Sequence, residues 1–176
     1  MEELFYDPLH NKFPKYTGKL LPASDPVLCA PCFEYRNLFD EDGYYLSAII
    51  YEMYRILENE GGVGLAANQI GIPLKVVVTI INKKYTSYTN PMIVGHEVGG
   101  PDNGMEDGAE GCLSLPNEHY MVKRYKHTCF SHIEYDQNGE EKPLYSHVYG
   151  LESRCIQHEI DHLNGILISR RGVKLT

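Results

Sequence analysis

Apolar residues recur at helical spacing between residues 45 and 60. They repeat every three or four positions, so that one face of a helix carries all of them: Leu46, Ile49, Ile50, Met53, Tyr54 and Leu57. Gly61 and Gly62 follow directly, and glycine is common just after the last turn of a helix. The pattern predicts an amphipathic helix that ends at this glycine pair.

Two segments after this helix have the composition of β-strands. Residues 74–81 form a β-branched run that predicts a buried strand, and residues 88–94 predict a second strand that Pro91 interrupts. Residues 95–108 are rich in turn residues and predict a loose segment. Residues 1–35, rich in Pro, Tyr and short polar pieces, predict loops that wrap the domain.

The last third of the chain predicts a hairpin followed by a helix. Residues 126–135 and 142–149 read as two strands, and Asp136-Gln137-Asn138-Gly139 between them is typical of a hairpin turn. A helix begins near Gly150 and ends at Asn164-Gly165. The order of elements predicts an α+β fold, with mostly antiparallel sheets packed around this last helix as the central one. We expect one domain over residues 1–176.

Composition narrows the classes of function. The chain has 16 basic and 24 acidic residues, a net charge of −8, and no basic run, which argues against direct binding to nucleic acids or anionic membranes. No apolar run has the length of a membrane span, and the first residues lack the features of a signal peptide. Five cysteines without an export signal are expected to be thiols or metal ligands. We therefore expect a cytoplasmic protein.

The last predicted helix contains a metal-binding pattern. His158 and His162 are four residues apart, so both lie on one helical face and can bind one metal ion. Glu159, beside the first histidine, can reach a water on that ion. A third ligand must come from upstream, because residues 163–176 contain no His, Cys, Asp or Glu.

Cysteines are the main candidates for the third ligand. Cys155 shares a face with His158 but is seven residues from His162, roughly 10.5 Å along the helix axis, which is too far for metal–ligand bonds of about 2.0–2.3 Å. We interpret Cys155 as a small apolar residue packed beside the site. Cys129 lies in a predicted strand without special context. Cys112 lies in a glycine-flanked segment, and its thiolate would complete three ligands and leave a fourth position for water.

A third segment, residues 62–69, is rich in glycine and alanine. It lacks the lysine and hydroxyl residue of a phosphate-binding loop, so that taken alone it is simply a helix end followed by a small-residue loop. Gln69 at its end offers an amide donor suited to a developing oxyanion.

Together the three segments resemble the signature motifs of peptide deformylases, in the same order. These are G-x-G-x-A-A-x-Q at residues 62–69, E-G-C-L-S at residues 110–114 and H-E-x-x-H at residues 158–162. The resemblance runs from about residue 25 to residue 168. It implies metal-dependent hydrolysis of the formyl group from the N-terminal formylmethionine of newly made polypeptides, with release of formate. It also implies a bacterial cytoplasmic enzyme, or a phage-encoded one acting in the host cytoplasm.

The resemblance also implies the roles of individual residues. The metal ligands are Cys112, His158 and His162. The metal in the family is usually Fe²⁺, although Zn²⁺, Ni²⁺ or Co²⁺ can occupy the site, and the ligand types alone suggest Zn²⁺ as readily. Glu159 takes a proton from the metal-bound water and later delivers it to the leaving amine. The amide of Gln69 and the backbone N–H of Leu113 meet the oxyanion.

Six residues are implied to contact the substrate: Gly62, Val63, Gly64, Leu113, Cys155 and His119. Gly62 would bond the peptide backbone as an added strand, and an apolar pocket would hold the methionine side chain. His119 is a departure, because many deformylases have an arginine near that position. We expect a short form without the long C-terminal helix of the enterobacterial type, so the resemblance does not imply ribosome association. The expected partners are nascent formyl-Met peptides, and the expected state is a monomer.

Several alternatives stay open at this stage. Glu110 and Arg124 either support the metal ligands or form a solvated ion pair. The C-x-x-C of Cys29 and Cys32 lacks the context of a redox motif. Single histidines are expected to be on the surface or hydrogen-bonded: His10, His96, His127, His132 and His147. An amidase or peptidase with another substrate, and a metal-stabilised binding module without activity, are the competing functions.

Overall fold

The computed structural model describes residues 9, 12–13, 15–36, 44–97, 102–136 and 139–176. Its helices are η1 (Pro26–Cys29), α2 (Tyr44–Glu60), η3 (Ala67–Ile70), α3 (Gly150–Leu163) and η4 (Ile168–Arg170). Its strands are β1 (Gly64–Ala66), β2 (Val76–Ile81), β3 (Lys84–His96), β4 (Met105–Cys112), β5 (Leu115–Tyr125), β6 (His127–Tyr135), β7 (Glu141–Tyr149) and β8 (Val173–Lys174).

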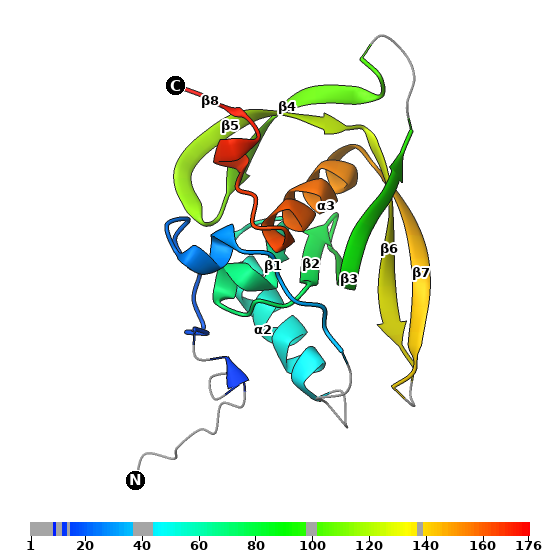
Figure 1. Cartoon of the computed structure of the whole chain (residues 1–176). Coiled ribbons are helices and arrows are strands. Elements are labelled where there is room, and N and C mark those ends of the chain that lie inside the picture. The colour runs from blue at the N-terminus through cyan, green and yellow to red at the C-terminus, as the bar shows by residue number, and fades with distance from the viewer. Residues whose placement is uncertain (1–8, 10–11, 14, 37–43, 98–101, 137–138) are drawn as a thin grey trace.

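Two antiparallel sheets flank helix α3. Five strands pair in the order β1-β2-β3-β6-β7, and three pair in the order β4-β5-β8. Helix α3 contacts strands of both sheets, and Figure 1 shows it between them. The predicted α+β class with antiparallel sheets is confirmed. Within the described residues, neither α-helix is both long and apolar enough to cross a membrane.

Helix α2 confirms the first predicted helix. Ile49, Met53 and Leu57 on its apolar face are fully buried, and the helix packs against β1 and β2. Gly61 directly after it has φ +69°, a left-handed conformation that glycine adopts without the steric cost of a Cβ. The glycine pair therefore ends the helix and directs the chain into β1.

The strands after α2 differ in detail from the prediction. Strand β2 begins at Val76, two residues later than predicted, while Leu74 forms an isolated bridge with Phe33. Strand β3 is longer than predicted and runs through Pro91. Its pairing with β6 shifts register between Thr89 and Met92, so the proline interrupts the ladder and not the strand.

Strands β4 and β5 were missed by the sequence analysis. Residues 95–108 were predicted to be loose, but β3 extends to His96 and β4 begins at Met105, while residues 98–101 lie outside the described residues. In β5 the inward-facing residues are Tyr120, Val122 and Arg124. A buried arginine breaks the apolar alternation by which a strand is recognised, because its partners are visible only in three dimensions.

The predicted hairpin and last helix are confirmed. Strands β6 and β7 pair along their full lengths, although Gln137 and Asn138 of the predicted turn lie outside the described residues. Helix α3 packs Ile156, Ile160 and Leu163 into a core with Val77, Phe130 and Val148 from the larger sheet. The described part of residues 9–35 is mostly irregular, as predicted, with η1 as a single short turn.

Candidate metal centre and active site

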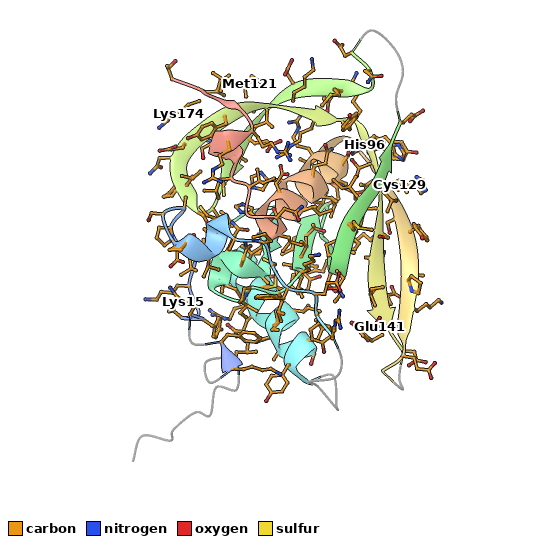
Figure 2. The ribbon with its side chains drawn as sticks, viewed as in Figure 1. Lys15, His96, Met121, Cys129, Glu141 and Lys174 are labelled. Atoms are coloured by element: carbon orange, nitrogen blue, oxygen red, sulfur yellow. The ribbon has the colours of Figure 1, made fainter. Side chains whose placement is uncertain are left out.

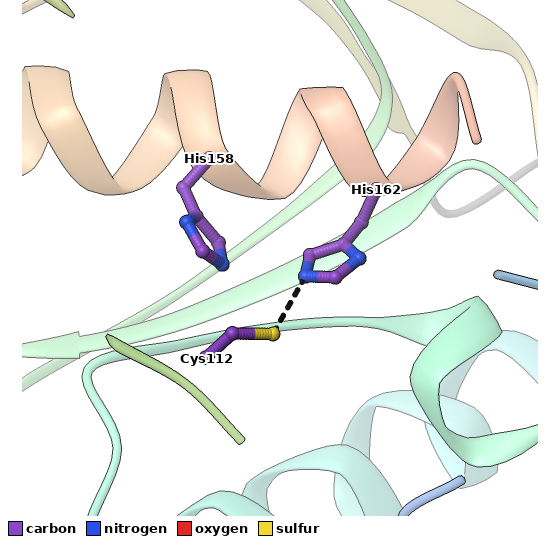
Figure 3. Close-up of side chains that lie close together, drawn as sticks. All are labelled: Cys112, His158 and His162. Atoms are coloured by element: carbon purple, nitrogen blue, oxygen red, sulfur yellow. Dashed lines mark hydrogen bonds between the residues drawn. The ribbon is translucent and has the colours of Figure 1, made fainter. Parts of the chain in front are cut away.

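Three side chains with metal-binding atoms meet between the two sheets. Cys112 is the last residue of β4, while His158 and His162 lie one turn apart on α3. Their ligand atoms all lie within 4.8 Å of one another, and Cys112 Sγ is 3.2 Å from His162 Nε2. All three residues are buried, and Figure 3 shows both rings directed toward the thiol. Tetrahedral S and N ligands of one ion, with bonds of about 2.3 and 2.0–2.1 Å, stand about 3.6 Å apart, so this arrangement fits a metal ion.

A local irregularity in the small sheet directs Cys112 toward α3. Strands β4 and β5 pair regularly as far as Gly111 with His119, and then the register shifts so that Cys112 pairs with Leu115. Such a shift bends one strand and changes where its side chains point. The tight turn of this ribbon therefore delivers the thiol to the two histidines.

Glu110 fixes the orientation of His158. Its Oε2 lies 3.0 Å from His158 Nδ1, which leaves Nε2 of the ring for a metal. The same carboxylate accepts hydrogen bonds from Arg124 Nε at 2.9 Å and from Arg154 Nη1 at 2.9 Å. Glu110 and Arg124 are 7% and 4% exposed, so the solvated ion pair left open by the sequence is wrong.

The electrostatics of the site favour a positive charge beside the thiol. Burial alone would lower the pKa of His158, but hydrogen bonds with Cys112 and Glu110 outweigh it and raise this pKa to about 10. Burial would raise the pKa of Glu110, yet its bonds with His158 and Arg124 hold this pKa at about 2. A cation held by thiolate and imidazole supplies the charge that these surroundings stabilise.

Glu159 has the environment of a proton carrier. Burial is the largest influence on this group and raises the pKa of Glu159 to about 7. Its Oε2 has no hydrogen-bond partner among the described residues, and the side chain faces the pocket. It does not belong to the group of convergent ligand atoms. A carboxyl group with such a pKa can both accept and return a proton near neutral pH.

The amide of Gln69 is oriented by its own loop. The backbone N–H of Ala66 donates to Gln69 Oε1 at 2.9 Å, so the amide NH₂ points the other way. That NH₂ lies 3.3 Å from Ser114 Oγ and 3.8 Å from Cys112 Sγ. Ser114 was not singled out in the sequence, although it ends the E-G-C-L-S segment. The amide is thus a donor held in place beside the thiol.

A pocket of about 530 Å³ opens at this site. All six residues expected to contact a substrate line it: Gly62, Val63, Gly64, Leu113, His119 and Cys155. Cys155 is buried beside Glu159 and lies outside the group of convergent ligand atoms, as its spacing predicted. Exposed Leu151 adds apolar surface to the pocket wall.

Gly64 is needed because strand β1 passes very close to α3. A Cβ on Gly64 would lie 2.5 Å from Cys155 Sγ and 2.5 Å from Glu159 Oε1. We expect Gly64→Ala to displace the Glu159 carboxyl group and to slow about 100-fold any reaction in which this group transfers a proton, because a small misplacement of a reacting group has an effect of this size. Steady-state rates with matched metal content measure this effect.

Gly95→Ala is the control, because a Cβ on Gly95 meets nothing within 4 Å. We expect this variant to keep the activity of the parent chain. Equal rates for Gly64→Ala and Gly95→Ala would mean that Glu159 tolerates displacement.

Further charged and polar residues support the site and were missed by sequence reasoning. Asp161 accepts a hydrogen bond from Arg124 Nη1 at 2.5 Å and two from Arg171, at 3.0 and 2.6 Å. Asn68 Nδ2 donates to the backbone oxygen of His162 at 2.6 Å. The available signal was weak: Asp161 sits beside a proposed ligand on a largely buried helix. Its partners come from other segments, Arg124 from β5 and Arg171 from the segment after α3.

The remaining cysteines and histidines that the sequence analysis named take no part in this site. Cys32 is buried, and burial raises the pKa of its thiol to about 12, which argues against a redox role for the C-x-x-C. His127 Nε2 lies 3.1 Å from His147 Nδ1, and His132 Nε2 lies 3.0 Å from Ser146 Oγ, as expected for hydrogen-bonded histidines. His96 stacks on Tyr125, and His10 lies outside the described residues.

Comparison with known proteins gives consistent matches. A model of the polypeptide deformylase family matches residues 18–176. Peptide deformylase 1 of Corynebacterium glutamicum is 37% identical over 151 residues, which cover 84% of this chain and 82% of that protein. Peptide deformylase 2 of Streptomyces avermitilis is 36% identical over 165 residues, which cover 89% of this chain and 81% of that protein.

Solved structures of the same kind share the fold. A peptide deformylase from Synechococcus elongatus in complex with actinonin matches with a TM-score of 0.75 and 32% identity, over 88% of this chain and 78% of that chain. PDF from the Vibrio parahaemolyticus bacteriophage VP16T, also in complex with actinonin, matches with a TM-score of 0.70 and 32% identity. That match covers 85% of this chain and 98% of the phage chain.

Proposed function

Because this chain belongs to the polypeptide deformylase family and removes the N-formyl group from new polypeptides, we propose that it does so in the pocket beside Cys112. The observation that carries this proposal is the convergence of three ligand atoms within 4.8 Å, next to an oriented amide and a buried carboxyl group. The whole chain would serve as one catalytic domain.

Three side chains are proposed to hold the metal ion: Cys112, His158 and His162. The ion we propose is Fe²⁺, on the strength of the family resemblance, and Zn²⁺, Ni²⁺ or Co²⁺ also fit one thiolate and two imidazoles. When bound, the ion would act as a Lewis acid and would lower the pKa of a water molecule, so that hydroxide is available near neutral pH. Glu110 contributes by holding His158 in the orientation that leaves Nε2 for the metal.

Glu159 is proposed to move the proton. Its carboxylate accepts a proton from the attacking water, whose oxygen bonds to the formyl carbon. When the carbon–nitrogen bond breaks, the carboxyl group returns this proton to the amine of methionine, and formate leaves. A pKa of about 7 suits both transfers.

The Gln69 amide and the backbone N–H of Leu113 are proposed to stabilise the negative charge on the formyl oxygen. We expect Gln69→Glu to lower kcat about 10²–10³-fold, because it replaces a donor with an acceptor and keeps the acceptor that binds Ala66 N–H. Steady-state kinetics with a formyl-Met peptide measures this loss. Ser114→Ala, which removes only a neighbour of this amide, should change kcat less than tenfold. Equal losses in both variants would contradict this role of Gln69.

The rest of the pocket is proposed to bind the formylated peptide. Val63, Leu113 and Cys155 would line the space for the methionine side chain, while Gly62 and Gly64 allow its backbone to approach β1. His119 lines the pocket, near the position where many deformylases have an arginine. We propose that the enzyme acts as a cytoplasmic monomer on nascent peptides, without direct contact with nucleic acids; the net charge of −8 supports the last point.

Formate release from formyl-Met-Ala-Ser tests this function. The protein is purified anaerobically with Fe²⁺ and compared on the formylated peptide and on acetyl-Met-Ala-Ser. We expect formate from the first and no cleavage of the second. No formate from folded, metal-loaded protein would overturn the proposal, and cleavage of the acetylated peptide would favour the competing amidase.

A further inference from the structure

A cysteine and a histidine meet on the outer face of the larger sheet. Cys129 on β6 pairs directly with His147 on β7, so both side chains project from the same face. Thr128 and Phe130, the neighbours of Cys129 in β6, are fully buried, which places Cys129 on the face directed away from α3. Figure 2 labels Cys129 at this sheet. The thiol is partly exposed and the imidazole is exposed, so an ion in solution can reach both.

The distance between the two side chains fits a shared metal ion. Cys129 Sγ lies 3.6 Å from His147 Nε2. A sulfur and a nitrogen that bind one tetrahedral ion, with bonds of about 2.3 and 2.0–2.1 Å, stand about 3.6 Å apart, whereas an ion in line between them would require about 4.3 Å. The pair therefore has the separation for a tetrahedral ion without any movement of β6 or β7.

His127, also on β6, supports the imidazole of His147. Its Nε2 lies 3.1 Å from His147 Nδ1, and the two rings are nearly parallel. The His127 ring also stacks on Tyr149, with 4.5 Å between the ring centroids. On its other side, His127 Nδ1 lies 3.2 Å from the backbone nitrogen of Glu97 and 3.9 Å from Glu97 Oε2. A metal-bound imidazole needs such an acceptor for its second N–H, because this hydrogen bond fixes the ring.

The hydrogen bonds of this cluster show how the protons would move. The N–H of Glu97 donates to His127 Nδ1, so His127 carries its proton on Nε2 and donates it to His147 Nδ1. An ion on His147 Nε2 would shift the proton of this ring to Nδ1 and reverse the chain, with His127 donating from Nδ1 to the Glu97 carboxylate. The Glu97 side chain is 73% exposed, so water can accept the backbone N–H that is released. Each imidazole keeps one proton, and only the thiol of Cys129 loses one to solvent.

We propose that Cys129 and His147 bind a divalent transition-metal cation such as Zn²⁺ on the outer face of the larger sheet, and that His127 orients His147 for this purpose. A thiolate with an imidazole selects cations of this class over Mg²⁺ and Ca²⁺, which prefer oxygen ligands. Two protein ligands leave two tetrahedral positions for water, so the ion should be held more weakly than by the three ligands around Cys112. These residues lie outside the pocket, and the inference does not depend on the proposed function.

The number of Zn²⁺ ions bound per chain tests this site. Reduced protein is dialysed to equilibrium against a series of buffered free Zn²⁺ concentrations, and the zinc content of the parent chain is compared with that of Cys129→Ser and His147→Gln. We expect the parent to bind one equivalent more than either variant, whatever the content of the site at Cys112. His127→Phe, which keeps a ring beside Tyr149, should weaken this equivalent about 10–100-fold, as expected when the residue that orients a ligand is lost.

Cys29→Ser is the matched control, because Cys29 is an exposed thiol whose neighbour is Arg170, with Nη2 3.8 Å from Sγ. This variant should keep the additional equivalent. Equal zinc contents in the parent, Cys129→Ser and His147→Gln would overturn the proposal. An equivalent that is lost from Cys29→Ser and kept in Cys129→Ser would also overturn it, because the ion would then be bound adventitiously at another exposed thiol.

Discussion

Replacing Glu159 by alanine should abolish most of the deformylation and leave the metal in place. The side chain is proposed to carry the proton from water to the leaving amine, and a positioned acid–base group contributes about 10²–10⁴-fold to a rate. The metal should remain because Glu159 lies outside the convergent ligand atoms. Formate release, measured beside the metal content of the same preparation, tests both statements.

Two further variants separate chemistry from structure. Glu159→Gln keeps the size of the side chain and should lose as much activity as the alanine variant. Glu152→Gln removes the same charge from the first turn of α3, away from the pocket, and should retain full activity. A Glu159→Ala chain that binds metal and releases formate at nearly the parental rate would show that another group moves the proton.

The sequence alone predicts much of this site because local patterns carry the information. The spacing of His158 and His162 places both rings on one face of α3, whatever surrounds the helix. The seven-residue spacing between Cys155 and His162 excluded Cys155 as a ligand, and the structure agrees. Cys112, from strand β4, lies with the two histidines instead. The helices α2 and α3 and the β6–β7 hairpin follow from apolar periodicity and turn residues in the same way.

Long-range charge pairing is what the sequence does not reveal. Arg124 and Glu110 lie fourteen residues apart on neighbouring strands. Because these charged residues occupy buried positions, the sequences of β4 and β5 resemble those of polar loops. Asp161 meets Arg171 from the segment after α3. The register shift at Cys112 depends on how β4 and β5 pair, which no local pattern specifies. Such features are visible only in the folded structure, because the burial of each charged residue depends on a partner that the local sequence does not identify.

Removing the buried carboxylate of Glu110 should lower the stability of the protein strongly. Glu110→Ala would leave Arg124 and Arg154, whose side chains are 5% and 13% exposed, without the oxygen that both contact at 2.9 Å. Removing one partner of a buried ion pair typically costs about 3–5 kcal/mol, because the remaining charge stays desolvated. We expect a loss of this size in the free energy of unfolding, from denaturant titration, although Asp161 still pairs with Arg124.

Glu118→Ala provides the contrast, because it breaks an ion pair with Lys174 whose partners are 32% and 58% exposed. Exposed pairs contribute about 0–1 kcal/mol, so this variant should unfold close to the parent. Glu110→Ala should also bind metal about 10–100-fold more weakly, since His158 loses the acceptor that orients its ring. If both variants lost less than about 1 kcal/mol, water would have to reach Arg124 and Arg154, and Glu110 would support the metal site only by orienting His158.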